Sequence, residues 1–285
     1  MVETGLMPEP DAGRVAVYLD FDNIVISRYD QVHGRNSFQK DKSRGLDAEH
    51  LERATVDVGA IIDFASSFGT LVLTRAYADW SAEVNAGYRS QLVARAVDLV
   101  QLFPAAAYGK NGADIRLAVD AVEDMFRLPD LTHVVIVGGD SDYIALAQRC
   151  KRLGRYVVGI GVAGASSGSL AAACDEFVTY DGLPGVTSAP KEASTKSARR
   201  ASTADAQAAA TGLLGRALRI VMQKDDDAEW LHNSAVKAQM KRMDPSFSEK
   251  SLGFKSFSDF LRSRADIVDL DESSTTRMVR LHSDA

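Results

Sequence analysis

Three groups of acidic residues have the types and spacings suited to holding a divalent metal ion. They are LDFDN at 19–23, KNGAD at 110–114 and GGDSD at 138–142. Each group places a carboxylate where a strand is expected to end or a helix to begin, and backbone amides there favour negative side chains. Carboxylate oxygens are hard ligands that suit Mg²⁺ or Mn²⁺ rather than zinc. The acids in all three groups are therefore candidate metal ligands.

A cluster of this kind is suited to the hydrolysis of phosphodiester bonds. Two divalent cations about 4 Å apart can activate a water molecule and stabilise the leaving oxygen. Without a cation, carboxylates that share one cleft raise each other's pKa. Any one of these acids alone is explained as well by an ordinary cap or turn, so it is their repetition at three corresponding places that favours a metal site. No side chain stands out as a general base.

The elements that must position these acids alternate between short apolar runs and amphipathic stretches. Near-continuous Val, Ile and Leu runs separated by helices predict a parallel sheet covered on both faces. In such a sheet, ligands bind beyond the carboxyl ends of the strands, where Asp20 and Asp140 are both expected. Strands are expected at 14–20, 70–77, 98–103, 133–137, 155–160 and 176–179, and helices at 46–68, 82–97, 113–126 and 142–153.

The composition divides the chain into two expected domains and a linker. Residues 14–181 hold the alternating α/β pattern. Residues 182–210 are rich in Ala, Ser, Thr and Lys with little to bury, which predicts a flexible linker. Residues 211–285 predict a small winged-helix-like domain. Its helices are expected at 212–223, 233–243 and 257–264, and its hairpin from 267–270 and 277–281.

The charge is unevenly distributed along the chain. The 285 residues carry a net charge of −6, and residues 1–181 contain 25 acidic and 17 basic side chains. An acidic first domain is unsuited to gripping RNA phosphates by bulk charge. It is compatible with acids gathered around a bound cation, because the cation reverses the local electrostatics.

The sequence also carries signals about location. It has two cysteines, too few for a disulfide framework, which indicates a reducing compartment. The first residues lack the apolar segment of a signal peptide, and no apolar run reaches the roughly 20 residues that span a bilayer. A cytoplasmic protein without a membrane segment is therefore expected.

Residues 14–181 resemble the NYN domain, a branch of the PIN-like metal-dependent nucleases. The resemblance is carried by VAVYLDFDN, KNGADIRLAVDA and VVIVGGDSDYIALAQRCKRLGRYVVGIGV. It implies a Rossmann-like PIN fold, with helices on both sides of a parallel sheet, and RNA cleavage that depends on a divalent metal. By motif position it assigns metal binding to Asp20, Asp114, Asp140 and Asp142. It gives Asn23 a supporting role, and Asp120 a lesser one.

The sequence departs from the family pattern at several positions. Asp22 stands where the pattern often has no second acid, so it either shares or disturbs the metal site. Asn111 interrupts the usual Lys-Gly pair, which weakens the expected phosphate contact of Lys110, while Arg116 is a further candidate RNA contact. Residues 29–47 form a polar insertion that is either a substrate-binding loop or a solvated surface loop.

The second domain resembles the LOTUS (OST-HTH) module. The stretch KSLGFKSFSDFLRSRADIVDLDESSTTRMVRL carries the resemblance. Such modules bind RNA or dock proteins, so RNA is the expected partner and a protein partner is possible through this domain. The candidate phosphate contacts are Lys255, Arg262 and Arg264.

Two other functions compete with a ribonuclease. A haloacid-dehalogenase-type phosphatase has an acid pair like Asp20 and Asp22, but Asp20 would have to attack phosphorus. Asn23 replaces the Thr or Val expected there, and the cap segment is missing. A noncatalytic RNA-binding or scaffold protein remains open. The sequence as a whole favours a Mg²⁺- or Mn²⁺-dependent ribonuclease.

Overall fold

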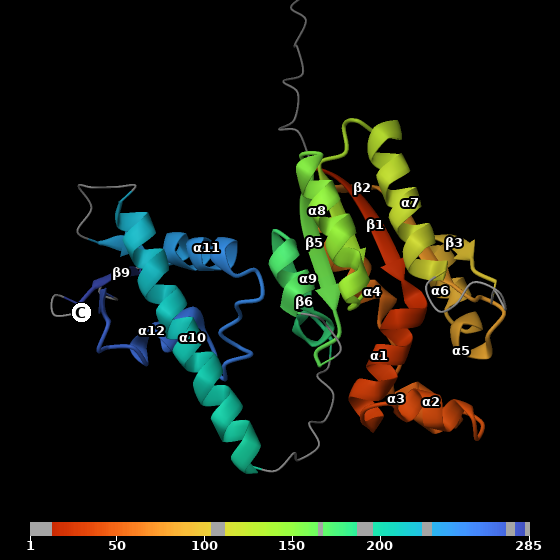
Figure 1. Cartoon of the computed structure of the whole chain (residues 1–285), viewed down its shortest axis with the longest axis horizontal. Coiled ribbons are helices and arrows are strands. Elements are labelled where there is room, and N and C mark those ends of the chain that lie inside the picture. Colours follow the sequence, from red (N-terminus) through yellow and green to blue (C-terminus); the bar gives the residue numbers. More distant parts are fainter. Residues whose placement is uncertain are drawn as a thin grey trace, which may run out of the picture. The chain divides into compact units, whose positions relative to one another are not determined.

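The structure, a computed structural model, consists of two compact units, Met1–Pro190 and Lys191–Ala285 (Figure 1). Each unit has its own buried core and is described by itself. The residues that the structure describes are 13–103, 112–164, 168–186, 196–223, 230–271 and 277–282, with the side chains of 196–204 excepted.

The first unit is built around a six-stranded parallel sheet with the order β3-β2-β1-β4-β5-β6. Every strand pairing within it is parallel, which confirms the expected α/β class. The central strand β1 is buried on both faces, as its unbroken apolar run predicts. The strands are β1 (Arg14–Asp20), β2 (Thr70–Ala78), β3 (Asp98–Gln101), β4 (His133–Val137), β5 (Tyr156–Gly161) and β6 (Glu176–Thr179).

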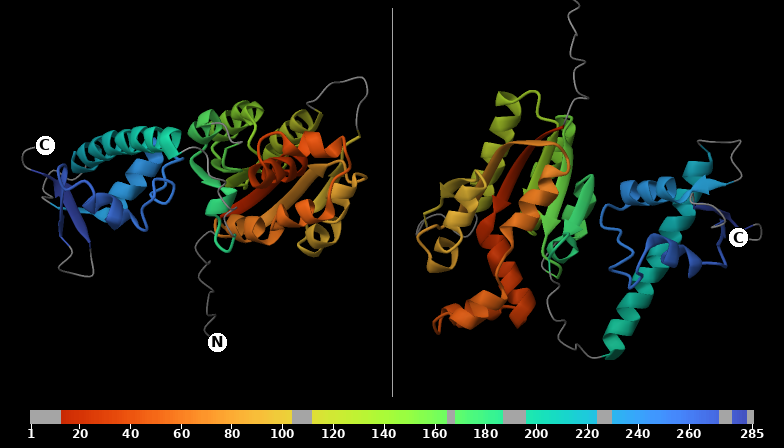
Figure 2. Two further views of the ribbon diagram at one scale, coloured as in Figure 1. Left: turned by 90° about the horizontal axis from the view of Figure 1, so that it is seen from below. Right: turned by 180° about the vertical axis from the view of Figure 1, so that it is seen from behind.

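Helices cover both faces of this sheet (Figure 2). Alternate residues of β1 point to opposite sides, so Val17 packs with α1 (Phe21–His33), α4 (Val58–Ser66) and α6 (Arg89–Ala94). Its neighbour Tyr18 packs with the helices of the other face. Those helices are α7 (Gly112–Arg127), α8 (Ile144–Arg152) and α9 (Gly168–Ala173). The result is the expected three-layer sandwich.

The chain order places a switch point at the centre of the sheet. The chain runs from β1 outward to β2 and β3, and then returns to β4 on the other side of β1. The loops that leave β1 and β4 therefore diverge in opposite directions. Such a point opens a crevice at the carboxyl ends of the two strands, which is where parallel sheets bind ligands. The short helix η1 (Ser141–Tyr143) follows β4 at this edge.

Two expected helices are each divided in the structure. The stretch 46–68 forms α3 (Ala48–Arg53) and α4, because Asp57 accepts a hydrogen bond from the backbone N of Ala60 (3.0 Å) and caps a new helix. The stretch 82–97 forms α5 (Glu83–Ala86) and α6, with Gly87 between them.

The polar insertion at 29–47 is helical rather than a loop. Helix α1 continues to His33, and α2 (Ser37–Lys42) follows it. Tyr29, Phe38 and Ala54 pack together as a small separate core. Most residues of this segment are polar, so the sequence did not reveal that Tyr29 and Phe38 pack together and fold the segment back onto α1.

The second unit has the expected winged-helix-like elements. Its antiparallel sheet has the order β7-β9-β8, and its helices enclose a core that includes Leu214, Val236 and Phe260. The elements are α10 (Lys196–Met222), β7 (Leu231–His232), α11 (Asn233–Met243), α12 (Phe257–Arg262), β8 (Val268–Asp271) and β9 (Met278–Leu281).

Helix α10 differs from the expected linker at 182–210. The helix begins at Lys196, well inside that segment, and runs on to Met222. Alanine has the highest intrinsic helix propensity, so an Ala-rich stretch can extend a helix even where it has little to bury. The residues preceding it include η2 (Tyr180–Gly182), which ends the first unit's regular structure.

No helix within the described ranges combines the length and the apolar character that crossing a membrane requires.

Candidate metal centre

Three carboxylates converge at the switch point of the sheet. Asp114 comes from the first turn of α7, and Asp140 and Asp142 come from the end of β4 and from η1. One oxygen of each carboxylate lies within 4.8 Å of the others. Asp114 and Asp140 are half-buried and Asp142 is exposed, so the cluster is open to solvent on one side.

Local hydrogen bonds hold the loop that carries two of these acids. Asp140 caps η1, because its Oδ1 accepts from the backbone N of Asp142 (3.2 Å). Asn23 Oδ1 accepts from the backbone N of Gly139 (3.0 Å) and so ties the start of α1 to the β4 loop. At Gly138, an added Cβ would lie 3.0 Å from the Tyr143 ring and 3.4 Å from the Asp20 Cβ. The glycine lets the loop pass closely over Asp20.

Asp20 lies behind the three acids rather than among them. It ends β1 with only 3% of its surface exposed and caps α1, accepting from the backbone N of Asn23 (3.2 Å). Its other oxygen accepts from the Tyr143 hydroxyl (2.7 Å). Of the four expected acids three converge closely, and Asp20 interacts with Asp114 both directly and through the Tyr143 hydroxyl.

Tyr143 is a site residue that the motifs did not single out. Its hydroxyl lies 2.7 Å from Asp20 Oδ2 and 2.8 Å from Asp114 Oδ1. The hydroxyl carries a single proton, so the two carboxylates share one donor. The signal in the sequence was an aromatic residue directly after GGDSD, on the buried side of the first turn.

The electrostatics of the cluster fit a missing positive charge. Burial raises the pKa of Asp20 to about 7, against the hydrogen bonds from Tyr143 and Asn23, and the negative charge of Asp114 raises it further. Burial also raises the pKa of Asp114, and Asp140 and Asp142 add to the effect. Near neutral pH Asp20 is therefore protonated more readily than an ordinary aspartate. Hard oxygen donors with this need for positive charge fit Mg²⁺ or Mn²⁺.

Asp22 faces away from the three acids. Its Oδ1 accepts from Asn85 Nδ2 (2.5 Å), and its Oδ2 accepts from the backbone N of Asp79 (3.2 Å). Burial raises the pKa of Asp22, while these two hydrogen bonds oppose the shift. The two acids of LDFDN therefore have different partners. Asp20 accepts a hydrogen bond from Tyr143 of η1, whereas Asp22 accepts one from Asn85 of α5.

Asp120 also stands apart from the three acids. It is buried on α7, where it accepts from the Tyr77 hydroxyl (3.1 Å) and from Arg116 Nε (2.9 Å). Its charge is therefore balanced by its own ion pair. The Arg116 side chain is 60% exposed despite this pair, and Lys110 lies outside the described residues.

The candidate RNA contacts of the second unit differ in their environments. Lys255 is exposed, and Arg262 lies in an ion pair with Asp259 (2.6 Å) at the surface. Arg264 donates from Nε to Thr211 Oγ1 (2.6 Å), and its guanidinium lies 5.2 Å from the centroid of the Phe260 ring. Arg264 is therefore tied into the edge of the core, whereas Lys255 is the more available of the three.

Comparisons with known proteins agree with this arrangement. Residues 14–181 match the NYN domain, and residues 213–280 match the OST-HTH/LOTUS domain. Among curated proteins, none matches the chain. A crystal structure of a protein of unknown function from Vibrio parahaemolyticus is similar, with 20% sequence identity, a TM-score of 0.41 and coverage of 61% of this chain and 96% of that one.

The family matches confirm both resemblances. The NYN match contains all three acidic motifs and the whole parallel sheet, and such domains have a PIN-like nuclease fold. The OST-HTH/LOTUS match covers the winged-helix-like unit, a type of domain associated with RNA. The chain therefore belongs to the NYN domain family and carries an OST-HTH/LOTUS domain after it.

Proposed function

We propose that this protein is a ribonuclease that hydrolyses RNA phosphodiester bonds with the help of Mg²⁺ or Mn²⁺. The observation that carries the proposal is the convergence of Asp114, Asp140 and Asp142 at the carboxyl edge of the sheet. The family of the first unit and the RNA association of the second point to RNA as the substrate. A cytoplasmic location is part of the same proposal.

The three acids would hold the cation, and their neighbours would keep them in place. When bound, such a cation activates water and neutralises the charge that develops on the phosphate oxygens. Asn23 fixes the β4 loop through Gly139, and Tyr143 fixes the carboxylate of Asp114. Asp20 accepts from the same Tyr143 hydroxyl and so helps to hold it in place.

The geometry disfavours a phosphatase that uses Asp20 as its nucleophile. Such a residue must reach phosphorus with a free carboxylate oxygen. Asp20 is 3% exposed, and both of its oxygens accept hydrogen bonds, from Asn23 and from Tyr143. Its position suits a supporting role behind the metal ligands better than attack on a substrate.

The proposal is tested by cleavage of end-labelled single-stranded and hairpin RNA with Mn²⁺, Mg²⁺ or EDTA. The key variant is Asp140→Asn, which removes one ligand charge while keeping the side chain's size and its cap on η1. We expect metal-dependent products from the wild type and at least a hundred-fold slower cleavage by the variant, since binding of the cation weakens.

The matched control is Asp130→Asn. Asp130 pairs with Arg14 at the opposite end of the strands and is 57% exposed, so cleavage should be unaffected. Full activity in a folded Asp140→Asn protein would exclude this metal centre. Metal binding without any cleavage by the wild type would favour a noncatalytic RNA-binding protein instead.

A further inference from the structure

Helix α7 carries apolar side chains on the side that faces solvent as well as on the side that faces the sheet. Leu117 is completely buried in the core beneath the helix. Ile115, Val119 and Phe126 are 64%, 57% and 70% exposed. Half-buried Val122 lies on the same face by its spacing, and we call these four residues the α7 stripe. A helix that is apolar on both sides is typical of one that is covered on both sides.

The α7 stripe differs from the other exposed apolar residues in the described parts of the chain. Of the seven large apolar side chains that are exposed there, three lie on α7. The other four lie on four different segments and are Ile26, Val93, Phe103 and Tyr156. Single exposed apolar residues are normal on a protein surface, whereas a contiguous row of them is typical of an interaction site.

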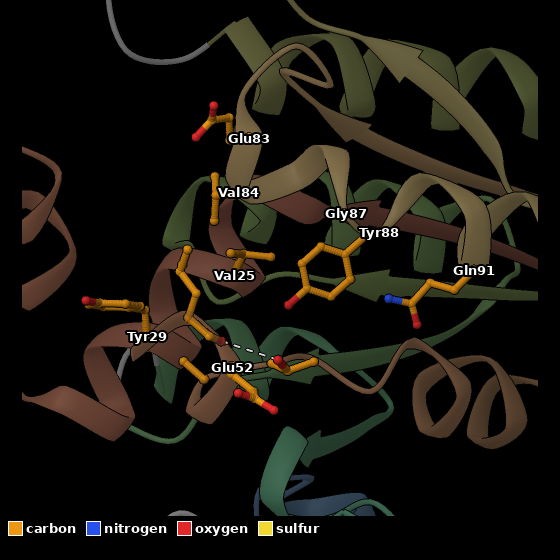
Figure 3. Close-up of a pocket in the computed structure, with 11 residues that line it drawn as sticks. Val25, Tyr29, Glu52, Glu83, Val84, Gly87, Tyr88 and Gln91 are labelled. Atoms are coloured by element: carbon orange, nitrogen blue, oxygen red, sulfur yellow. Dashed lines mark hydrogen bonds between the residues drawn. The ribbon is translucent and has the colours of Figure 1, made fainter. Parts of the chain in front are cut away.

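The cavity of the first unit is a feature of a different kind. It has a volume of about 330 Å³, and Val25, Val84 and Tyr88 are among the residues that line it (Figure 3). These three side chains pack in the core on the opposite face of the sheet from α7, and none of them is exposed. Their apolar surface is therefore largely covered within the unit, whereas that of the α7 stripe is not.

The spacing of the α7 stripe is the same in both directions along the helix. Its positions are separated by four, three and four residues, so reversing the helix leaves the pattern unchanged. Two antiparallel copies of α7 related by a two-fold axis would therefore place Ile115 opposite the partner's Phe126. The same axis would place Val119 opposite the partner's Val122. A surface that is complementary to itself in this way is what a symmetric dimer requires.

The charges beside the α7 stripe are also complementary to themselves in this arrangement. Arg116 and Glu123 directly follow two residues of the stripe, so they lie along the same edge of it. Their side chains are 60% and 57% exposed. An antiparallel two-fold pair brings each edge against the same edge of the other copy, so Arg116 would lie beside the partner's Glu123 at two equivalent places. A parallel pair would bring the charged edge against the uncharged one.

Both charged side chains already have a partner on their own helix. Arg116 pairs with Asp120 (2.9 Å), and Glu123 pairs with Arg127 (3.1 Å). Across the two-fold axis the two pairs would join into a row of four charges of alternating sign. Such a row favours one orientation of the two copies more than it adds affinity. The stripe would supply the affinity, and the charged edge the antiparallel direction.

We propose that this protein forms a symmetric homodimer through the α7 stripe, with the two copies of α7 antiparallel. The proposal does not depend on the ribonuclease function. The partner's helix would cover the exposed side chains of Ile115, Val119 and Phe126 and remove their apolar surface from water. A contact built mainly on one 16-residue helix from each copy is at the small end of specific interfaces, so we expect a Kd of about 1–100 µM.

Sedimentation equilibrium of the full-length protein tests the dimer. As the concentration rises from about 1 to 200 µM, the average mass should rise toward twice the 30.7 kDa of one chain. Val119→Glu should weaken the dimer at least about a hundred-fold, because two carboxylates would be buried close together at the two-fold axis. Val119 is exposed in a single copy, so the variant should fold, which its urea midpoint checks.

The matched control is Val93→Glu. Val93 is 61% exposed, much like Val119, but it lies on α6, on the opposite face of the sheet. The same change of side chain there should leave the dimer intact.

Disulfide cross-linking tests the orientation of the two helices. The natural cysteines, Cys150 and Cys174, are buried, so cysteines introduced on α7 report on the surface alone. In an antiparallel pair, Ile115 lies opposite the partner's Phe126 but about 16 Å along the helix axis from the partner's Ile115. Oxidising a mixture of Ile115→Cys and Phe126→Cys proteins should therefore give a linked dimer with one copy of each. Neither variant should cross-link by itself.

A dimer in the wild type and in Val93→Glu that is lost in a folded Val119→Glu protein, together with the mixed cross-link, would support the proposal. A wild type that stays monomeric at the highest concentration would overturn it, and so would a dimer that survives Val119→Glu or dissociates in Val93→Glu. Cross-linking of either cysteine variant by itself would overturn the antiparallel arrangement. Metal-dependent cleavage of RNA is measured separately, so none of these outcomes decides the ribonuclease proposal.

Discussion

At the scale of single residues, the unusual feature is a buried tyrosine between two carboxylates. Tyr143 is 1% exposed and contacts Asp20 and Asp114 through the same hydroxyl. It relieves the repulsion between the two acids while no cation is bound, since its hydroxyl is a hydrogen-bond donor to both carboxylates.

Removing that hydroxyl should make the folded protein more dependent on metal. We expect Tyr143→Phe to lower the free energy of unfolding by about 1–3 kcal/mol in EDTA, because the two acids lose their common partner. Mn²⁺ should then raise the melting temperature more in the variant than in the wild type. Thermal unfolding with EDTA and with Mn²⁺ measures both effects. An equal metal-induced shift in the two proteins would contradict this role of Tyr143.

The raised pKa of Asp20 gives a second prediction, for the metal-free protein. This pKa is about 7 in the folded state against an ordinary 3.8, so between these values the folded state binds more protons than the unfolded one. The free energy of unfolding should therefore fall by a few kcal/mol as the pH rises from about 4 to 7. Asp20→Asn should reduce this slope, leaving the smaller part that belongs to Asp114, and be more stable than the wild type at pH 8. Urea denaturation in EDTA across this range tests it, and the same slope in both proteins would refute it.

Sequence reasoning identified the acids but not their grouping. The three motifs pointed to Asp20, Asp114, Asp140 and Asp142, of which the last three converge closely. They gave Asp22 and Asp120 supporting roles but did not reveal their partners, because the residues that engage these two acids come from distant segments. Asn85 is 63 residues from Asp22, and Tyr77 is 43 residues from Asp120. Such long-range pairing leaves no local pattern.

At the scale of elements, the strands were more predictable than the helices. The apolar runs of β1 and β4 define the strand bounds directly, because a strand buried on both faces tolerates few polar residues. The divided helices were missed because an aspartate such as Asp57 suits a helix interior or a cap, and only the tertiary fold decides between them.

Helix α7 is anchored to the sheet by polar contacts that sequence periodicity does not reveal. Asp124 is 4% exposed and accepts from the Tyr18 hydroxyl (3.1 Å) and from Arg75, both on strands. Because the same helix carries Asp114 in its first turn, these contacts help to fix where that acid lies.

Breaking this anchor should reduce stability without removing the metal site. We expect Asp124→Asn to lower the free energy of unfolding by about 2–3 kcal/mol, since Arg75 loses its charged partner in a mostly buried place. Glu123→Gln, which loses only an exposed pair with Arg127, should change it by less than about 1 kcal/mol. Urea denaturation and Mn²⁺ titration give the two readouts. Loss of Mn²⁺ binding with unchanged stability would place Asp124 in the metal site.

At the scale of the whole molecule, the two units have separate cores. The cores of the first unit draw on strands β1 to β6, whereas the core of the second consists of residues 210–281. The acidic excess lies in the first unit, since residues 211–285 contain equal numbers of acidic and basic side chains, twelve of each. Binding of a cation and binding by the second unit should therefore be separable.

Calorimetry should show this separation directly. We expect two unfolding transitions, of which only the one belonging to the first unit moves upward with Mn²⁺. A ligand at about a hundred times its Kd stabilises the unit that binds it by about 2.7 kcal/mol and leaves an independent unit unchanged. Protein truncated after residue 190 identifies the transition of the first unit. A single transition that shifts as a whole would contradict the independence of the units.

The separation of the site residues along the chain also bears on synthesis. Tyr143 reaches back 123 residues to Asp20, and Asp140 and Asp142 follow the fourth strand. A nascent chain that has not yet released this segment from the ribosome lacks two of the three converging acids. If the proposed activity requires all three acids, a chain stalled or terminated before residue 140 is expected to be inert toward the RNA that surrounds it on the translating ribosome. The order of the strands in the chain delays the proposed activity until the central sheet can close around β1.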